Sequence, residues 1–177
     1  MKKLSLILIF ILITALSVLL VTDRFKVRYK PEIDYYADEY SLDRHLVYAL
    51  IKAESSFDPD ALSCKGAAGL MQVTGETAAW CAEKIGDADL ADRIKEPEVN
   101  LKVGCFYLSY LLDRYSGSET AALAAYNAGA GNADKWLSDS EHSPDGASLS
   151  SAPFTETDRY LKKVMLYKKI YAFLYNA

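Results

Sequence analysis

The 177-residue chain carries a net charge of −4, and 51% of its residues are hydrophobic, which is enough for one domain with a substantial core. This composition excludes an intrinsically disordered chain, and the negative charge argues against nucleic acid as a partner. Three cysteines and two histidines, none with metal-ligand spacing, argue against a structural zinc site, and no motif predicts a metal or organic cofactor.

The N-terminal segment predicts a membrane-spanning helix. Residues 4–21 are uncharged and almost wholly apolar. As a helix they would extend about 27 Å, close to the thickness of the hydrocarbon core of a bilayer. Lys2 and Lys3 precede the segment, and no A-x-A cleavage site follows it. We therefore predict a signal-anchor over residues 1–21, with a cleaved signal peptide as the alternative.

A charged juxtamembrane linker is predicted over residues 22–31, ending at Pro31. The basic residues that follow the apolar segment are Arg24, Lys26, Arg28 and Lys30. Counting these charges by the positive-inside rule would place the rest of the chain in the cytoplasm. We nevertheless expect an extracytoplasmic domain, either anchored by a single span or secreted after cleavage, because the activity suggested below requires it.

From residue 32 the signals are nearly all helical. Ser41 is predicted to cap a helix whose apolar stripe includes Leu46 and Leu50. Thr74 is predicted to cap a short helix that ends at Gly86.

The second half of the chain continues this pattern. A long helix is expected from Pro97 to a stop at Gly117, and Ser118 is expected to cap the next helix, which ends at Gly129. A short helix is expected at residues 134–137 and a polar, flexible insertion at residues 138–153. Thr155 and Asp158 then resemble a capping box before a final helix. The prediction is one mainly α domain over residues 32–177, with little or no β structure beyond a short excursion at residues 60–75.

Glu54 is the first candidate for chemistry. It follows Leu50 by four residues and Leu46 by eight, so on a helix the carboxyl group shares the apolar face. Burial and the negative end of the helix dipole would both raise its pKa, as a general acid requires. The alternative is a glutamate that points into water and pairs with Lys52 or Lys65.

Four sequence blocks in a fixed order favour the functional interpretation: "AESSF", "SCKGAAGLMQV", "AAYNAG" and "PFTETDRYLKKV". Over residues 36–175 the chain resembles the catalytic domain of soluble lytic murein transglycosylases, which is related in fold to goose-type lysozyme. The resemblance implies cleavage of the β-1,4 bond between N-acetylmuramic acid and N-acetylglucosamine, leaving a 1,6-anhydromuramoyl end. Peptidoglycan glycan strands would be the partner, while any contact with cell-wall or secretion machinery stays unidentified.

The resemblance also assigns roles to residues. Glu54 would first protonate the leaving oxygen and then accept the proton of the muramic acid C6 hydroxyl. The implied substrate-binding residues are Ser63, Met71, Gln72 and Tyr126. Supporting roles fall to Ser55, as a local hydrogen-bonding residue, to Asn127, which would hold a turn, and to Glu156, as a carboxylate that hydrogen-bonds within the cluster.

Two rival functions were weighed. A lysozyme-type hydrolase would need a second carboxylate to position water, from Asp58, Asp60 or Glu156. A non-catalytic peptidoglycan-binding subunit would have no reason to keep a desolvated acid. The cysteines leave two states open, one disulfide with a free thiol or three free thiols, and the pairs considered are Cys64–Cys81 and Cys81–Cys105.

Overall fold

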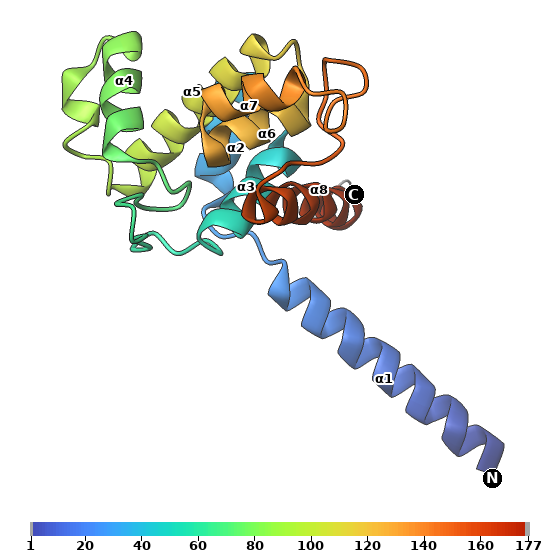
Figure 1. Cartoon of the computed structure of the whole chain (residues 1–177). Helices are drawn as coiled ribbons and strands as arrows, with labels where there is room; N and C mark the ends of the chain where they lie inside the picture. Colours follow the sequence, from blue (N-terminus) through green and yellow to red (C-terminus); the bar gives the residue numbers. More distant parts are fainter. Residues whose placement is uncertain (1, 176–177) are drawn as a thin grey trace.

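The structure, a computed structural model, describes residues 2–175, with side chains described for residues 10–16 and 19–175. Its elements in chain order are α1 (Lys2–Arg24), α2 (Lys30–Glu39), α3 (Arg44–Glu54), α4 (Gly75–Ile85), the 3-10 turn η1 (Ala88–Leu90), α5 (Pro97–Arg114), α6 (Glu119–Ala128), α7 (Ala130–Leu137) and α8 (Thr155–Tyr175). Helix α1 projects away from the body formed by the other helices (Figure 1).

Within the described residues, no helix combines the length and the apolar character needed to cross a bilayer. A membrane segment was expected at residues 4–21. The side chains of residues 4–9 and 17–18 in this segment lie outside the described ones.

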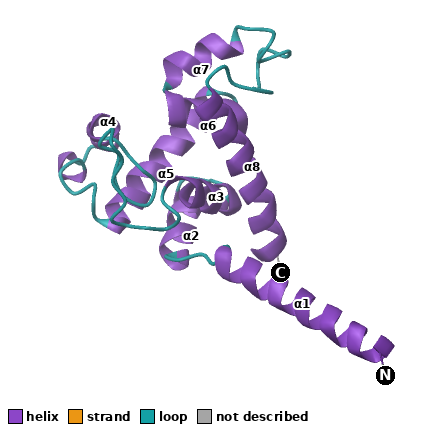
Figure 2. Cartoon of the chain, turned by 60° about the horizontal axis from the view of Figure 1, so that its bottom comes forward, coloured by secondary structure: helices purple, strands orange, loops and turns teal. Residues whose placement is uncertain are grey.

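Helix α3 forms the centre of the domain, packed against α2 on one side and along α8 on another (Figure 2). Every residue from Leu46 to Lys52 in α3 is buried. Tyr48 from α3 contacts Tyr171 from α8, with ring centroids 5.6 Å apart, and Phe25 packs on the same Tyr171 ring. The aromatic residues therefore join the last helix to the segment that precedes α2.

Local sequence signals located several helix ends correctly. The Thr74 side chain accepts a hydrogen bond from the Thr77 N–H, and Gly86 ends α4 in the left-handed conformation. The Ser118 side chain accepts from the Ala121 N–H at the start of α6. The mainly α prediction is confirmed, since residues 2–175 contain no strand but only isolated bridges near Ala68.

The predicted start of α3 was wrong by two residues. Asp43, not Ser41, is the cap, and its carboxylate accepts from the His45 N–H at 2.8 Å. Ser41 instead lies in the turn that ends α2, with φ 54°. Helix α2 was not predicted, and its first residues occupy the end of the expected linker at residues 22–31.

The segment expected to be a flexible insertion, residues 138–153, is folded. Asp145 accepts hydrogen bonds from the N–H groups of Ala147 and Ser148. Leu149 is buried, and its N–H donates to the Thr120 hydroxyl of α6 at 2.9 Å. Helix α7 also begins earlier than expected, at Ala130.

Candidate active site

Glu54 is the last residue of α3, and its half-buried side chain borders a cavity of about 410 Å³. The cavity lies between the end of α3, the end of α6 and the first turns of α8. It is lined by Ala53, Glu54, Asn127, Thr155, Glu156, Arg159, Tyr160 and Lys163. The carboxyl group thus borders a space that is open to a substrate.

Burial raises the pKa of Glu54 from 4.5 to about 7, although the Tyr160 hydroxyl and the Lys163 ammonium group each act to lower it. A carboxyl group with this pKa is partly protonated at neutral pH, so it can donate a proton and later accept one. This burial agrees with the expectation that Glu54 lies on the apolar face of its helix. The alternative pairing with Lys52 or Lys65 does not occur among the described ion pairs.

Helix α8 supplies two neighbours of Glu54 that the sequence analysis did not single out. Lys163 donates from Nζ to the backbone oxygen of Ala53 at 2.9 Å, which places its charge at the end of α3. The Tyr160 hydroxyl is buried beside the Glu54 carboxyl group, and its pKa is raised well above 10 by burial and by Glu54. Both residues belong to the quoted block "PFTETDRYLKKV", and their i, i+3 spacing was the available signal.

Tyr126 links the Glu54 carboxyl group to the glycine-rich loop. Its hydroxyl donates to the Met71 backbone oxygen at 2.9 Å. Its pKa is raised well above 10 by burial and by the negative charge of Glu54, so the hydroxyl stays protonated. The structure brings Tyr126 and Glu54 into one electrostatic cluster, while direct contact of Tyr126 with a sugar stays a prediction.

The Met71 side chain lies in the core rather than at the surface of the cavity. It is fully buried, and its sulfur lies 3.9 Å from that of Cys105. A Cβ atom added at Gly104 would come within 2.5 Å of the Met71 sulfur, so the helix approaches closely here. If Met71 contacts a substrate, it would do so through its backbone atoms and not through its side chain.

Gln72 and Ser63 shape the loop between α3 and α4. The Gln72 amide donates to the backbone oxygens of Ala61 and Gly69, both at 3.0 Å. The Ser63 hydroxyl accepts from the Ala67 N–H at 3.0 Å. Contact of either residue with substrate stays a prediction.

Ser55 and Asn127 make side-chain hydrogen bonds to residues distant in the sequence, and the bond of Asn127 goes to another helix rather than within a turn. The Ser55 hydroxyl donates to the Leu70 backbone oxygen at 2.7 Å, which fixes the loop against the end of α3. The Asn127 side-chain oxygen accepts from the Thr157 hydroxyl at 2.9 Å, joining α6 to α8. The second bond joins two helices that border the cavity, and the first fixes the loop that follows Glu54.

Asn100 of α5 is a structural residue that the sequence analysis missed. It is fully buried, accepts from the Met71 N–H at 2.8 Å, and donates to the backbone oxygens of Ala68 and Ile94. A Cβ atom at Gly69 would lie 2.5 Å from the Asn100 amide nitrogen, so only glycine fits there. An asparagine among apolar helix positions was the signal that could have indicated this role.

The carboxylates considered as a second catalytic group are separated by the fold. Glu156 is exposed and borders the same cavity as Glu54, but it makes no hydrogen bond or ion pair with any described residue. Asp58 accepts from the Asp60 N–H, and Asp60 lines a different hollow of about 220 Å³. Of the three, Glu156 alone shares the cavity with Glu54.

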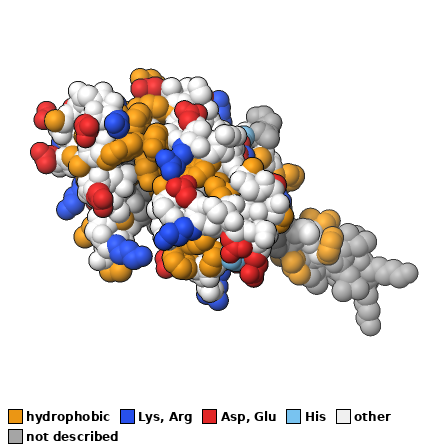
Figure 3. Space-filling model, turned by 45° about the horizontal axis from the view of Figure 1, so that its top comes forward, with side chains coloured by type: hydrophobic (Ala, Val, Ile, Leu, Met, Phe, Trp, Pro, Cys, Tyr) orange, Lys and Arg blue, Asp and Glu red, His pale blue; other side chains and the backbone are white. Residues whose placement is uncertain are grey.

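A second hollow, of about 350 Å³, lies between α4, α5 and the start of α7 and is lined by Trp80, Tyr107 and Tyr110 among others. The Tyr107 ring centroid is 5.3 Å from that of Tyr126. Aromatic side chains therefore extend from Tyr126, beside Glu54, into this hollow. On the face drawn in Figure 3, hydrophobic side chains form a band beside a patch of mixed acidic and basic side chains.

All three cysteines are free thiols, with Cys64 exposed and Cys81 and Cys105 buried. This answers the question of disulfide pairing that the sequence left open. Among the described residues, no group of three or more His, Cys, Asp or Glu side chains is placed to hold a metal ion.

Comparison with known proteins assigns the family. The family model "Transglycosylase SLT domain" matches residues 31–148, which is more than half of the chain. The chain belongs to the transglycosylase SLT domain family.

Several lytic murein transglycosylases are similar to this chain in sequence. The soluble lytic murein transglycosylase of Salmonella typhimurium is 32% identical over 152 residues, covering 84% of this chain and 24% of the relative. The membrane-bound lytic murein transglycosylase C of Glaesserella parasuis is 32% identical over 114 residues, covering 59% of this chain and 31% of the relative.

Among solved structures, the lytic transglycosylase Slt of Pseudomonas aeruginosa matches with a TM-score of 0.78 and 31% identity. The match covers 89% of this chain and 26% of that one, which is a variant, described as inactive, with glutamine in place of one glutamate. The chain thus spans about a quarter of the length of the Salmonella relative and of this structure.

Proposed function

We propose that this protein is a peptidoglycan lytic transglycosylase that cleaves the β-1,4 bond between N-acetylmuramic acid and N-acetylglucosamine. The observation that carries the proposal is the raised pKa of Glu54, about 7, at the edge of the 410 Å³ cavity. Membership of the SLT family supports the same reaction. The inactive glutamate-to-glutamine variant of the Pseudomonas enzyme supports a catalytic glutamate in the family.

In the proposed mechanism, one carboxyl group performs both proton transfers. Protonated Glu54 donates its proton to the glycosidic oxygen as the bond to C1 of muramic acid breaks. The resulting carboxylate then accepts the proton of the C6 hydroxyl, as O6 bonds to C1 and closes the 1,6-anhydro ring. The attack is intramolecular, so proximity replaces an activated water, and the sugar acetamido group assists at C1. Glu54 ends protonated and ready for another cycle.

The neighbours of Glu54 suit this alternation between two charge states. The Lys163 ammonium group, held on the Ala53 oxygen, would stabilise the transient carboxylate. Tyr126 would keep the loop carbonyl of Met71 in place while its hydroxyl faces the same cluster. The glycan strand would continue towards Trp80 and Tyr110, whose rings offer flat apolar faces to sugars.

Peptidoglycan lies outside the cytoplasm, so we place the domain there. The apolar residues 4–21 would serve as its membrane tether, and the boundaries of a linker at residues 22–31 and a domain at residues 32–177 are part of the same proposal. The occurrence of membrane-bound lytic transglycosylases among the relatives supports a tethered arrangement.

Hydrolysis is the second candidate, because Glu156 borders the same cavity as Glu54. A water molecule held by Glu156 would give a reducing muramic acid in place of the anhydro end. Digestion of purified murein with the full-length chain, followed by mass spectrometry, separates the two reactions because the anhydro product is lighter by one water. If only reducing ends are found, the reaction is hydrolysis and the proposal is wrong. If no fragments are released, the protein is a binding protein.

A further inference from the structure

Two cationic side chains of α8 face the cavity beside Glu54. Arg159 and Lys163 are four residues apart, so they lie on the same side of the helix, and both border the cavity. Lys163 already has a proposed part in stabilising the Glu54 carboxylate. The proposed reaction gives Arg159 no part, so its place beside Glu54 calls for another role.

The Arg159 guanidinium group differs in its contacts from other arginines of the domain. Arg44, Arg93 and Arg114 each pair with a carboxylate within the chain. Arg159 is exposed and makes no hydrogen bond or ion pair with any described residue. A guanidinium group free of internal partners can bind a carboxylate through two parallel hydrogen bonds.

The charge of the cavity changes with the state of Glu54. The titratable groups around it are Glu54, Glu156, Arg159, Tyr160 and Lys163. With Glu54 ionised, two carboxylates balance the two cations. With Glu54 protonated, as the proposed reaction requires at its start, one positive charge is in excess. The competent form of the site is therefore the one that favours an anionic ligand.

We propose that Arg159, assisted by Lys163, forms a subsite for a carboxylate on the glycan substrate and selects strands that carry one near the scissile bond. The inference rests on the proposed function. Muramic acid supplies such a group in two ways: the lactyl ether ends in a free carboxylate on strands without stem peptides, and stem peptides carry carboxylates of their own. Chitin-type strands of N-acetylglucosamine carry neither.

Binding measurements on the full-length Glu54→Gln protein test the subsite without turnover. The ligands are glycan strands stripped of stem peptides, stem-bearing strands, and the same two preparations with their carboxylates converted to neutral amides. We expect Arg159→Gln to weaken binding of carboxylate-bearing strands about tenfold, the size of one charge-assisted hydrogen bond, and to leave binding of the amidated strands unchanged. Arg159→Lys should lose less, because it keeps the charge.

Lys162→Gln is the matched control, since Lys162 lies on the same turn of α8 but is exposed and pairs with Asp158. It should change binding of no strand. A loss confined to stripped strands would identify the lactyl carboxylate, and a loss confined to stem-bearing strands would identify a peptide carboxylate. Either supports the subsite. Equal binding of native and amidated strands, or equal losses on both, overturns it.

The outcome is separable from that of the proposed function. A wild-type protein that releases no anhydro product would refute the activity, while binding by the Glu54→Gln protein would still decide the subsite. Should Arg159→Gln unfold in a thermal melt, Lys163→Gln on the two sets of strands gives the same comparison.

Discussion

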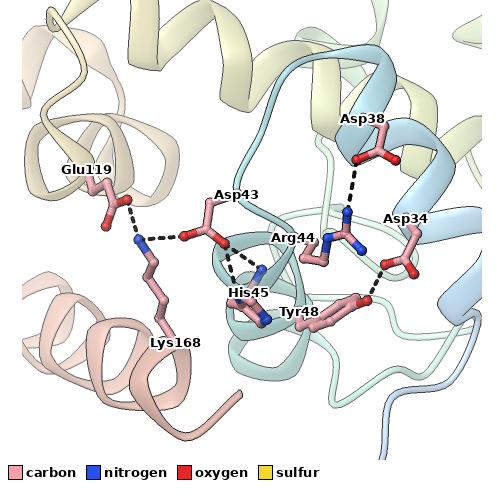
Figure 4. A network of polar contacts seen from close by, with 8 residues as sticks. All are labelled: Asp34, Asp38, Asp43, Arg44, His45, Tyr48, Glu119 and Lys168. Carbon is pink, nitrogen blue, oxygen red and sulfur yellow. Dashed lines mark hydrogen bonds and ion pairs between the residues drawn. The ribbon is translucent and has the colours of Figure 1, made fainter. Parts of the chain in front are cut away.

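The two ends of α3 meet the same helix, α8, with opposite electrostatic results. At the N-terminal end, Asp43 contacts Lys168 at 2.9 Å, and Lys168 also bonds Glu119 of α6 (Figure 4). Burial acts to raise the pKa of Asp43, but the hydrogen bonds from Lys168 and the His45 N–H outweigh it and lower the pKa. At the C-terminal end, burial dominates and raises the pKa of Glu54 to about 7.

The difference lies in what each lysine binds. Lys168 bonds directly to two carboxylates, whereas Lys163 donates to the backbone oxygen of Ala53 and acts on Glu54 only through space. Asp43 is therefore held ionised, whereas Glu54 can be protonated near neutral pH, as the proposed reaction requires. The group that each lysine binds, more than the presence of the lysine, therefore decides the protonation state of the nearby acid.

The most severe test of this contrast removes the protonatable acid. Glu54→Gln should lower the rate of anhydromuropeptide release by about 10³-fold, because the amide cannot donate an acidic proton. The matched control is Glu119→Gln at the opposite end, which should retain activity. If the Glu54→Gln protein released anhydromuropeptides at a rate near that of the wild type, another residue would be the catalytic acid.

Asn100→Ala should reduce the free energy of unfolding by about 2–4 kcal/mol, because it leaves buried backbone groups of the loop without partners. Chemical denaturation measures the change. Asn132→Ala, which removes one bond to Ala128 at a partly exposed site, should cost less than about 1 kcal/mol. Similar losses for both would mean that Asn100 does not organise the loop beside Glu54.

The contribution of Glu54 to the stability of the protein should fall as pH rises towards 7 and beyond. The pKa of Glu54 is about 7 in the folded state against 4.5 for the free side chain, so the folded state binds the proton more tightly. The stabilisation is present below pH 4.5 and lost as pH rises through 7. The Glu54→Gln protein lacks this titrating group. Between pH 4.5 and pH 8, its free energy of unfolding should therefore fall by about 2 kcal/mol less than that of the wild type. Parallel pH curves for the two proteins would contradict the raised pKa.

Tyr126→Phe should slow turnover by about tenfold, less than the loss of the acid, since one hydrogen bond to the loop disappears. Tyr115→Phe, whose hydroxyl bonds Asp134 in another region, is the control and should leave turnover unchanged. If the Tyr126 variant matches wild type, its hydroxyl has no part in the reaction.

Lys168→Met should have the smallest effect, a loss of about 1 kcal/mol in the free energy of unfolding with activity retained, because partly exposed ion pairs contribute little. Because the pKa of Asp43 is lowered in the folded state, this contribution exists above pH 3.8 and disappears as the pH falls further. Denaturation at pH 7 and at pH 3 measures it. A large loss of activity would show that the two ends of α3 are coupled.

The parts of the molecule that could be predicted from sequence depend on nearby residues. The apolar stripe through Leu46 and Leu50 placed Glu54 on the inner face, and Thr74 and Ser118 act on N–H groups three residues away. These signals are local, so a single sequence contains them.

The missed features depend on partners far along the chain. Asn100 bonds residue 71 across 29 positions, and Lys163 bonds residue 53 across 110. The inward direction of the Met71 side chain, in the loop before α4, likewise depends on Gly104 of α5. The spacing of residues in a sequence does not predict such distant contacts. The family resemblance indicated the sequence blocks that form the site, but not how their side chains are arranged.

The Tyr175 hydroxyl, at the end of α8, bonds the backbone of both Phe25 and Val27. Entry and exit of the folded body therefore share one corner. A body of this kind can be inserted into a larger polypeptide, or rearranged by circular permutation, without stretching any connection across its surface. That geometry suits a domain that matches about a quarter of a much longer relative.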